Sequence, residues 1–265
     1  MPVPVSLVPE PPGLAALHEG ELPQKDQLCG AFWVSLALAS AGYPVDQDGA
    51  ALRAGTTLAG GDPAGWLPPG ASPRTDYRLD IPAAADEPSS GTSARGVARA
   101  IEGLSEGKLS VVPVAGPWSA ASVVGLLEAV AASANEYVLI SNLRTGRLWG
   151  SRPHPALLLD HLAGRPTDPP PPDWDCGHFV GVAGSIVGPG GALVVLRDTY
   201  RELGWDGHHL QPAEAVAAAL ARGDGKEGGV LCVCEPTAAG TLGTKLGEAG
   251  FELRLWDNGS ADGEA

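Results

Sequence analysis

The longest apolar run in the chain, AFWVSLALASAG at residues 31–42, is hydrophobic on nearly every side when it is wound as a helix. This run predicts a buried central helix, and Gly42 is suited to cap its C-terminal end. Hydrophobic and polar spacing predicts further helices at residues 13–20, 91–105, 119–133 and 208–223. Thr92 or Ser93 is the expected N-cap of the second of these helices, and Ser119 that of the third.

Strand-like patterns of Val, Ile and Leu gather in the second half of the chain. They predict strands at residues 108–116, 136–143 and 228–236, with a shorter candidate at YRLDI, residues 77–81. A hairpin is expected where segments 175–187 and 192–200 flank the turn GPGG. The predicted fold class is α+β, with a buried N-terminal helix packed on an antiparallel β-sheet.

The order of these segments predicts one large domain over residues 13–256, preceded by a Pro-rich extended arm at 1–12. Residues 257–265 are polar and acidic and are expected to form a frayed tail. Two stretches rich in Pro and Gly, 44–90 (above all 60–90) and 144–174, are expected to be irregular. Long loops inside a domain usually serve a site, so these two are candidates for shaping one.

The 265-residue chain carries a formal net charge of -14, and no cluster of Lys or Arg offsets it. Such a surface repels phosphates, so nucleic-acid binding is excluded as the leading function. No run approaches the roughly 20 apolar residues of a membrane span, and residues 1–12 lack the features of a secretory signal. Four cysteines are too few for a disulfide framework in a chain of this length, so a cytoplasmic location is expected.

Three residues carry candidate chemistry when they are taken together. Cys29 stands at the start of the buried helix and is followed by Gly30, a position where the helix dipole favours a thiolate. His178 begins one strand of the predicted hairpin, and Asp198 ends the other strand. The hairpin therefore brings Asp198 back toward His178, where a carboxylate can orient an imidazole. This pattern predicts a catalytic triad of nucleophile, base and orienter.

The order of these three residues and their local context resemble those of papain-like cysteine peptidases. Gln24 lies five residues before Cys29, and the segment PQKDQLCG is similar to the Gln and Cys-Gly signature of bacteriocin-processing peptidases, which cut after a double-glycine leader. GHFVGVAG and VVLRDTY are similar to the Gly-His and Asp strands of that branch. The resemblance implies a papain-like fold with Gln24 as an oxyanion donor. Gln27 is the alternative donor.

By this resemblance, the chain is expected to be a cysteine-dependent hydrolase that cleaves a peptide or amide bond, with a peptide or small amide as its substrate and no metal or other cofactor. Maturation of a ribosomally made peptide is one role that the resemblance implies. Two alternatives stay open: an acyl or amide transferase with the same acyl-enzyme, and a papain-like scaffold that binds a peptide without cutting it. The oligomeric state does not follow from the sequence.

Other reactive residues have simpler interpretations. Cys176 lies two residues before His178 but lacks a helix start, so Cys29 is the preferred nucleophile. Cys232 and Cys234 alternate along one strand and are expected to pack in the core on the same face. His208 and His209 have no neighbours with metal-ligand spacing. Asn142 and the tryptophans at 149, 174 and 205 are candidates for lining a cleft.

Overall fold

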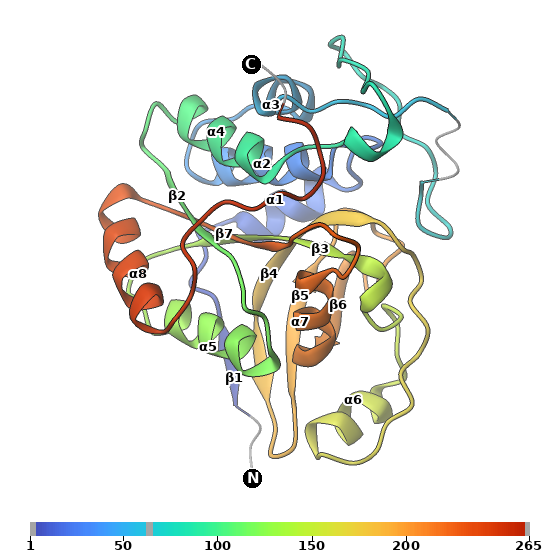
Figure 1. The fold of residues 1–265 in the computed structure, drawn as a ribbon, viewed down its shortest axis with the longest axis vertical. Coiled ribbons are helices and arrows are strands. Elements are labelled where there is room, and N and C mark those ends of the chain that lie inside the picture. Colours follow the sequence, from blue (N-terminus) through green and yellow to red (C-terminus); the bar gives the residue numbers. More distant parts are fainter. Residues whose placement is uncertain (1–3, 62–65, 263–265) are drawn as a thin grey trace.

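The computed structural model describes residues 4–61 and 66–262, and within them the fold is α+β with an antiparallel sheet of seven strands (Figure 1). The neighbouring strands follow the order β2-β7-β3-β4-β5-β6, and β1 pairs with the far part of β4. The strands are β1 (Val5–Leu7), β2 (Ser110–Val114), β3 (Val138–Arg144), β4 (Gly177–Val187), β5 (Ala192–Arg197), β6 (His208–Pro212) and β7 (Gly229–Cys234). The predicted fold class, α+β with an antiparallel sheet, is confirmed.

Helices cover both faces of the sheet and form two separate hydrophobic cores with it (Figure 1). One face carries α1 (Leu14–Glu21), α2 (Cys29–Ser40), α3 (Gln47–Ala54) and α4 (Ala94–Leu104). The other face carries α5 (Ala120–Ala131), α7 (Ala213–Ala221) and α8 (Pro236–Glu248), while α6 (Pro155–Leu162) packs beside β5. Along β7, Leu231 and Val233 join the first core, and Cys232 and Cys234 join the second. The expectation that both cysteines pack on one face is confirmed.

The helix α2 is the buried central helix that the apolar run predicts, and every residue from Gly30 to Leu38 is buried. Its side chains are apolar all round because it lies between α1, α3, α4 and strand β4. Trp33 packs directly over Gly181 of β4, where a Cβ atom would lie only 2.2 Å from the indole ring. This close approach fixes the distance between the start of α2 and the start of β4.

Several elements differ from the sequence-based expectations. The stretch 44–90 contains α3, whose N-cap Asp46 accepts a hydrogen bond from the Gly49 N–H, and the stretch 144–174 contains α6. The strand candidate at 77–81 is not a strand. These residues instead belong to a loop. The buried side chains of Lys25 and Asp48 hold this loop by hydrogen bonds to the backbone of Asp76 and Arg78.

The two ends of the chain are also more ordered than an arm and a frayed tail. Val5–Leu7 of the expected arm extend the sheet as β1. In the expected tail, Asn258 is buried and donates from Nδ2 to the Thr92 carbonyl, and the Ser260 hydroxyl donates to the Ser90 carbonyl. Residues 263–265 lie outside the described residues. None of the helices in the described part of the chain is long and apolar enough to cross a membrane.

Candidate active site

A cavity of about 610 Å³ opens where the N-terminus of α2 meets the start of β4. Cys29 and His178 line it together with Gln24, and the loop around residues 87–92 and the C-terminal segment around 258–260 form part of its wall. Asp198 lies buried behind His178. The fold therefore brings the four sequence-predicted site residues to one place, although they come from distant parts of the chain.

Cys29 is the first residue of α2 and is partly exposed, while the rest of the first turns is buried. The free N–H groups of a helix start create a positive potential that favours a thiolate. Gly30 follows because the loop at Thr92 crosses here, and a Cβ atom on Gly30 would lie 2.8 Å from the Thr92 Cβ. The glycine therefore lets the cavity wall pass close to Cys29.

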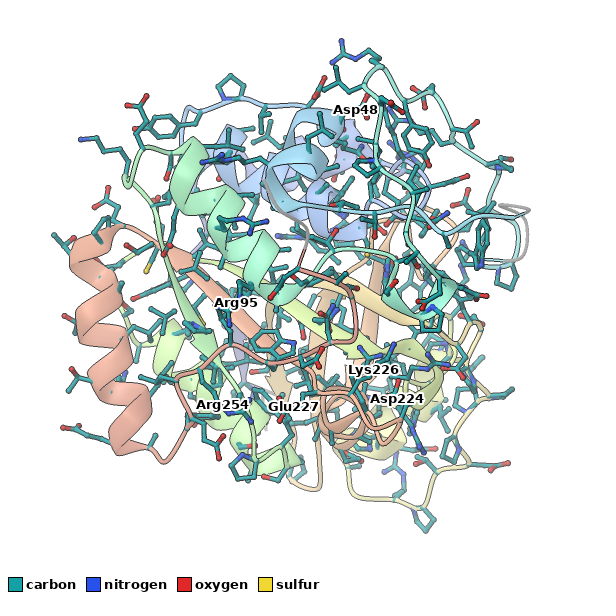
Figure 2. The ribbon with its side chains drawn as sticks, turned by 45° about the horizontal axis from the view of Figure 1, so that its top comes forward. Asp48, Arg95, Asp224, Lys226, Glu227 and Arg254 are labelled. Carbon is teal, nitrogen blue, oxygen red and sulfur yellow. The ribbon has the colours of Figure 1, made fainter. Side chains whose placement is uncertain are left out.

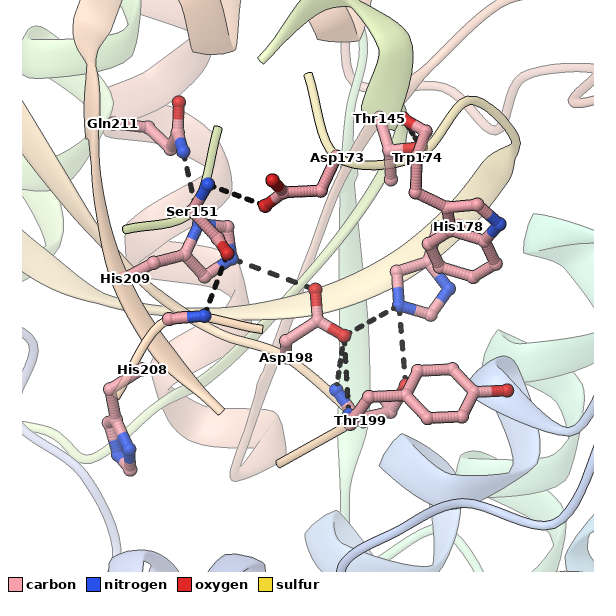
Figure 3. A network of polar contacts seen from close by, with 12 residues as sticks. Thr145, Ser151, Asp173, Trp174, His178, Asp198, Thr199, His208, His209 and Gln211 are labelled. Atoms are coloured by element: carbon pink, nitrogen blue, oxygen red, sulfur yellow. Dashed lines mark hydrogen bonds and ion pairs between the residues drawn. The ribbon is translucent and has the colours of Figure 1, made fainter. Parts of the chain in front are cut away.

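His178 Nε2 donates a hydrogen bond to Asp198 Oδ1 over 3.1 Å, and both side chains are almost fully buried (Figure 3). The backbone N–H groups of Thr199 and Tyr200 also donate to this carboxylate oxygen, at 2.7 Å and 3.3 Å. The side chain of Cys29 lies close enough to the imidazole to raise the pKa of His178. Because Asp198 occupies Nε2, Nδ1 is the ring nitrogen that is left for Cys29.

The charges of this group stabilise one another. Burial alone lowers the pKa of His178, but the Asp198 carboxylate and then Cys29 raise it to about 10. Burial alone raises the pKa of the Asp198 carboxyl, but the charge and hydrogen bond of His178, with a further contribution from His209, hold it well below its usual range. At neutral pH the site therefore contains an imidazolium between a carboxylate and the Cys29 sulfur.

Gln24 is connected to the same group through Thr199, a residue that the sequence analysis did not single out. The Thr199 hydroxyl donates to Gln24 Oε1 over 2.5 Å, and its oxygen lies 3.3 Å from His178 Nε2. The Gln24 backbone N–H donates to the Thr199 carbonyl at 2.9 Å. Because Oε1 is bonded to Thr199, the amide nitrogen Nε2 of Gln24 points away from Thr199 at the edge of the cavity. This nitrogen makes no hydrogen bond to the described residues.

Gln27 also lines the cavity, but both ends of its amide are engaged. Its Oε1 accepts from the Ala59 N–H at 2.6 Å, and its Nε2 donates to the Ala59 carbonyl at 3.3 Å. Gln27 therefore fixes the loop at Ala59 through both its oxygen and its nitrogen, whereas Gln24 Nε2 makes no hydrogen bond to the described residues.

Two further histidines contact Asp198 and were missed by sequence reasoning. His209 Nε2 lies 3.6 Å from Asp198 Oδ2, and His18 Nε2 lies 2.7 Å from the Asp198 carbonyl oxygen (Figure 3 for His209). Burial lowers the pKa of His18 to about 4, so this ring is neutral and donates from Nε2. Successive side chains of β6 point to opposite faces of the sheet, and His209 is one of those that are buried. No local signal in the sequence indicates either contact with Asp198.

Two aromatic rings pack against the imidazole and against each other. The Trp174 ring meets His178 edge-on with centroids 5.0 Å apart (Figure 3). The Tyr200 ring stacks on His178 at 6.3 Å and meets Trp174 edge-on at 5.7 Å. Trp174 lines the cavity, and so does Asn142, whose Nδ2 donates to the His178 carbonyl at 3.4 Å. Trp149 instead packs against His161, and Trp205 is 48% exposed outside the cavity.

Cys176 also lines the cavity, but burial, and then the charge of Cys29, raise the pKa of its thiol well above the usual range. Its Sγ contacts the Thr145 hydroxyl at 3.9 Å. Residues 4–61 and 66–262 contain no group of three His, Cys, Asp or Glu side chains able to hold a metal ion.

Comparison with known sequences gives the chain a family. Residues 8–257 match a family of unknown function, DUF6885, and since this covers nearly the whole chain, the protein belongs to that family. No curated protein sequence matches it significantly.

Proposed function

We propose that this member of the DUF6885 family is a papain-like, cysteine-dependent hydrolase that cleaves a peptide or amide bond through an acyl-enzyme on Cys29. The observation that carries the proposal is the buried His178–Asp198 pair, 3.1 Å between Nε2 and Oδ1, with Cys29 at a helix start beside the imidazole. A buried ion pair is costly unless it is well bonded, and one that adjoins a partly exposed thiol in a cavity is typical of catalysis.

The reaction follows from these positions. The Cys29 thiolate attacks the carbonyl carbon, and the developing oxyanion accepts hydrogen bonds from Gln24 Nε2 and from the Cys29 backbone N–H. The C–N bond breaks as the His178 imidazolium gives its proton to the leaving amine. His178, now neutral, takes a proton from water, the water oxygen attacks the thioester, and the C–S bond breaks to release the acid and Cys29. Asp198 stabilises the imidazolium throughout.

An amine in place of water would convert the same acyl-enzyme into a transferase product, and a scaffold that binds without cutting would use the cavity alone. Mass spectrometry of products from a peptide library, formed with and without added amines, distinguishes hydrolysis from transfer. Cys29→Ala is the control in both cases. If wild type and Cys29→Ala give identical products from every peptide, the enzyme proposal is wrong.

A first test needs no substrate. Iodoacetamide at neutral pH should label Cys29 before the other cysteines, because burial raises the pKa of Cys176 and Cys232 and takes that of Cys234 to about 11. Peptide mapping after partial labelling measures the order. If Cys176 is labelled ahead of Cys29, the proposal has assigned the nucleophile to the wrong residue. We also propose a reducing, cytoplasmic location, supported by the four free cysteines.

A further inference from the structure

Arg222 is a buried cation in the wall of the candidate active site, and the reaction described above does not use it. It directly follows α7, is 3% exposed, and lines the same cavity as Cys29. Its backbone has φ 60° and ψ -68°, a conformation that is strained for a residue with a side chain. Such a conformation persists only where the surrounding contacts fix the residue, and here those contacts hold the guanidinium in the cavity wall.

The position of this guanidinium is set from three sides. Nε and NH2 donate to the two oxygens of Asp224 at 3.2 Å and 2.9 Å, and NH1 donates to Asn142 Oδ1 at 3.4 Å. The NH1 and NH2 atoms lie against Gly177, where a Cβ atom would be 3.3 Å and 3.1 Å from them. Three of the five N–H donors are thus engaged, which leaves two without an acceptor among the described residues.

Gly177 directly precedes His178, so the guanidinium lies beside the residue next to the catalytic base. An extended peptide advances about 3.3–3.6 Å per residue. A group on a substrate residue one or two positions from the attacked carbonyl is therefore within reach of Arg222.

The charges around Arg222 leave it the most open of the cations in the cavity wall. Arg144 and Lys226 line the cavity together with Arg222, and so do three acids, Asp26, Glu87 and Asp175, so apart from His178 the charges of the lining balance. Arg144 forms ion pairs with Asp175 and Asp224, and the Lys226 ammonium donates to the Pro88 carbonyl at 3.3 Å. Lys226 and Asp224 lie close to one another in Figure 2, and the Lys226 backbone N–H donates to Asp224 Oδ1 at 3.3 Å. An anion is therefore favoured locally, by the two N–H groups of Arg222 that have no acceptor among the described residues.

We propose that Arg222 forms a carboxylate-binding subsite, which selects substrates with an acidic group one or two residues from the bond that is cut. The guanidinium supplies two donors to the substrate carboxylate while Asp224 holds its other edge, a geometry that suits a planar anion. This inference rests on the proposed function, because it takes Cys29 as the point of attack.

The test uses pairs of Cys29-directed probes in which Glu replaces the isosteric Gln: acetyl-X-Gly and acetyl-X-Gly-Gly chloromethyl ketones and N-iodoacetyl-X. The rate of Cys29 labelling is measured by intact-protein mass spectrometry, with neutral iodoacetamide as the reference reagent. In wild type, the Glu probe should react about tenfold faster than the Gln probe in at least one pair, the effect of one charge-assisted hydrogen bond. The preference should fall as salt is added.

Arg222→Gln should abolish this preference, which is taken as the ratio of the Glu to the Gln rate within each variant, so that any change in the intrinsic reactivity of Cys29, measured with iodoacetamide, cancels. Lys108→Gln is the matched control, because it removes the same charge from an exposed position outside the cavity lining and should keep the preference. Arg222→Lys provides a second variant that keeps the charge and should retain part of the preference.

The outcomes separate the two proposals. If iodoacetamide does not label Cys29 in wild type, the proposed function fails. If Cys29 is labelled but no pair shows a Glu preference, or if the preference persists in Arg222→Gln, the subsite is overturned and the proposed function stands.

Discussion

The Thr199 hydroxyl joins two parts of the candidate active site, because it donates to Gln24 Oε1 over 2.5 Å while its oxygen lies 3.3 Å from His178 Nε2. An amide can present either its oxygen or its nitrogen to a cavity, and only the nitrogen can donate to an oxyanion. By engaging Oε1, Thr199 selects the orientation in which Gln24 is a donor. The same residue therefore contacts the proposed base, His178, and orients the proposed oxyanion donor, Gln24.

We predict that Thr199→Val slows acylation of Cys29 by an activated ester about tenfold, less than the loss of a whole oxyanion donor. Alkylation by iodoacetamide should change by no more than about twofold, because that displacement forms no oxyanion. Stopped-flow measurement of both reactions on one preparation checks this. Thr199→Ser keeps the hydroxyl and should restore acylation; equal losses in the two reactions would indicate a general structural effect instead.

The two glutamines give a second prediction. Gln24→Ala should lower the acylation rate by roughly two to three orders of magnitude, the usual effect of removing one oxyanion donor. Gln27→Ala should have a much smaller effect, because both the oxygen and the nitrogen of its amide are bonded to the Ala59 backbone. The ester assay measures both variants. A larger loss in Gln27→Ala than in Gln24→Ala would reverse the assignment of the oxyanion donor.

A third prediction concerns pH. Because Asp198 and Cys29 hold the pKa of His178 at about 10, the imidazolium persists through neutral pH and is lost only as the pH rises through that value. The folding stability that the ion pair contributes depends on pH in the same direction. It is present in full below the unfolded His pKa of about 6.5 and is lost as the pH rises toward about 10. Asp198 adds stability that is present above about 3.9, the unfolded Asp pKa, and is lost in acid.

In Asp198→Asn the carboxylate is gone, so the alkaline limb of the Cys29 acylation profile should move to lower pH, and a reduced but measurable rate should remain. The measurement is the acylation rate against pH for both proteins. Gly125→Ala, a change in α5 outside the cavity lining, should leave the limb in place. An alkaline limb at the same pH in Asp198→Asn and wild type would mean that Asp198 does not set the pKa of His178.

The sequence predicted the central helix and the hairpin because their signals are local. The apolar run at 31–42 is long enough to exclude a surface helix, and the turn GPGG brings His178 and Asp198 together once both strands are recognised. Helix α3 was missed because its eight residues include Gly49 and stand among Pro-rich segments. It forms through the Asp46 cap and through contacts with α2 and α4, which only tertiary packing supplies.

The same limit applies to the site. Cys29, His178 and Asp198 stand at element boundaries, where residue type and position together indicate chemistry. Thr199 and Gln24 are 175 positions apart, so their hydrogen bond has no counterpart in any local pattern. Arg222 is read from the sequence simply as the end of a helix, and only the folded chain shows that its side chain enters the cavity wall.

The last prediction tests how α2 is held on the sheet. Gly181→Ala would place a methyl group 2.2 Å from the Trp33 ring, and Trp33 is 1% exposed with no room to withdraw. Overpacking of a core typically costs 1–3 kcal/mol, and we expect about that loss in the free energy of unfolding, measured by urea denaturation. Gly125→Ala is the matched control: a Cβ there meets nothing within 4 Å in the middle of α5, so the same change should stabilise by roughly 0.5–1 kcal/mol.

Because Trp33 lies one turn after Cys29 and Gly181 lies three residues after His178, Gly181→Ala should also slow alkylation of Cys29, whereas Gly125→Ala should not. Equal stability of the two variants would show that the contact between Trp33 and Gly181 does not determine how α2 packs on β4.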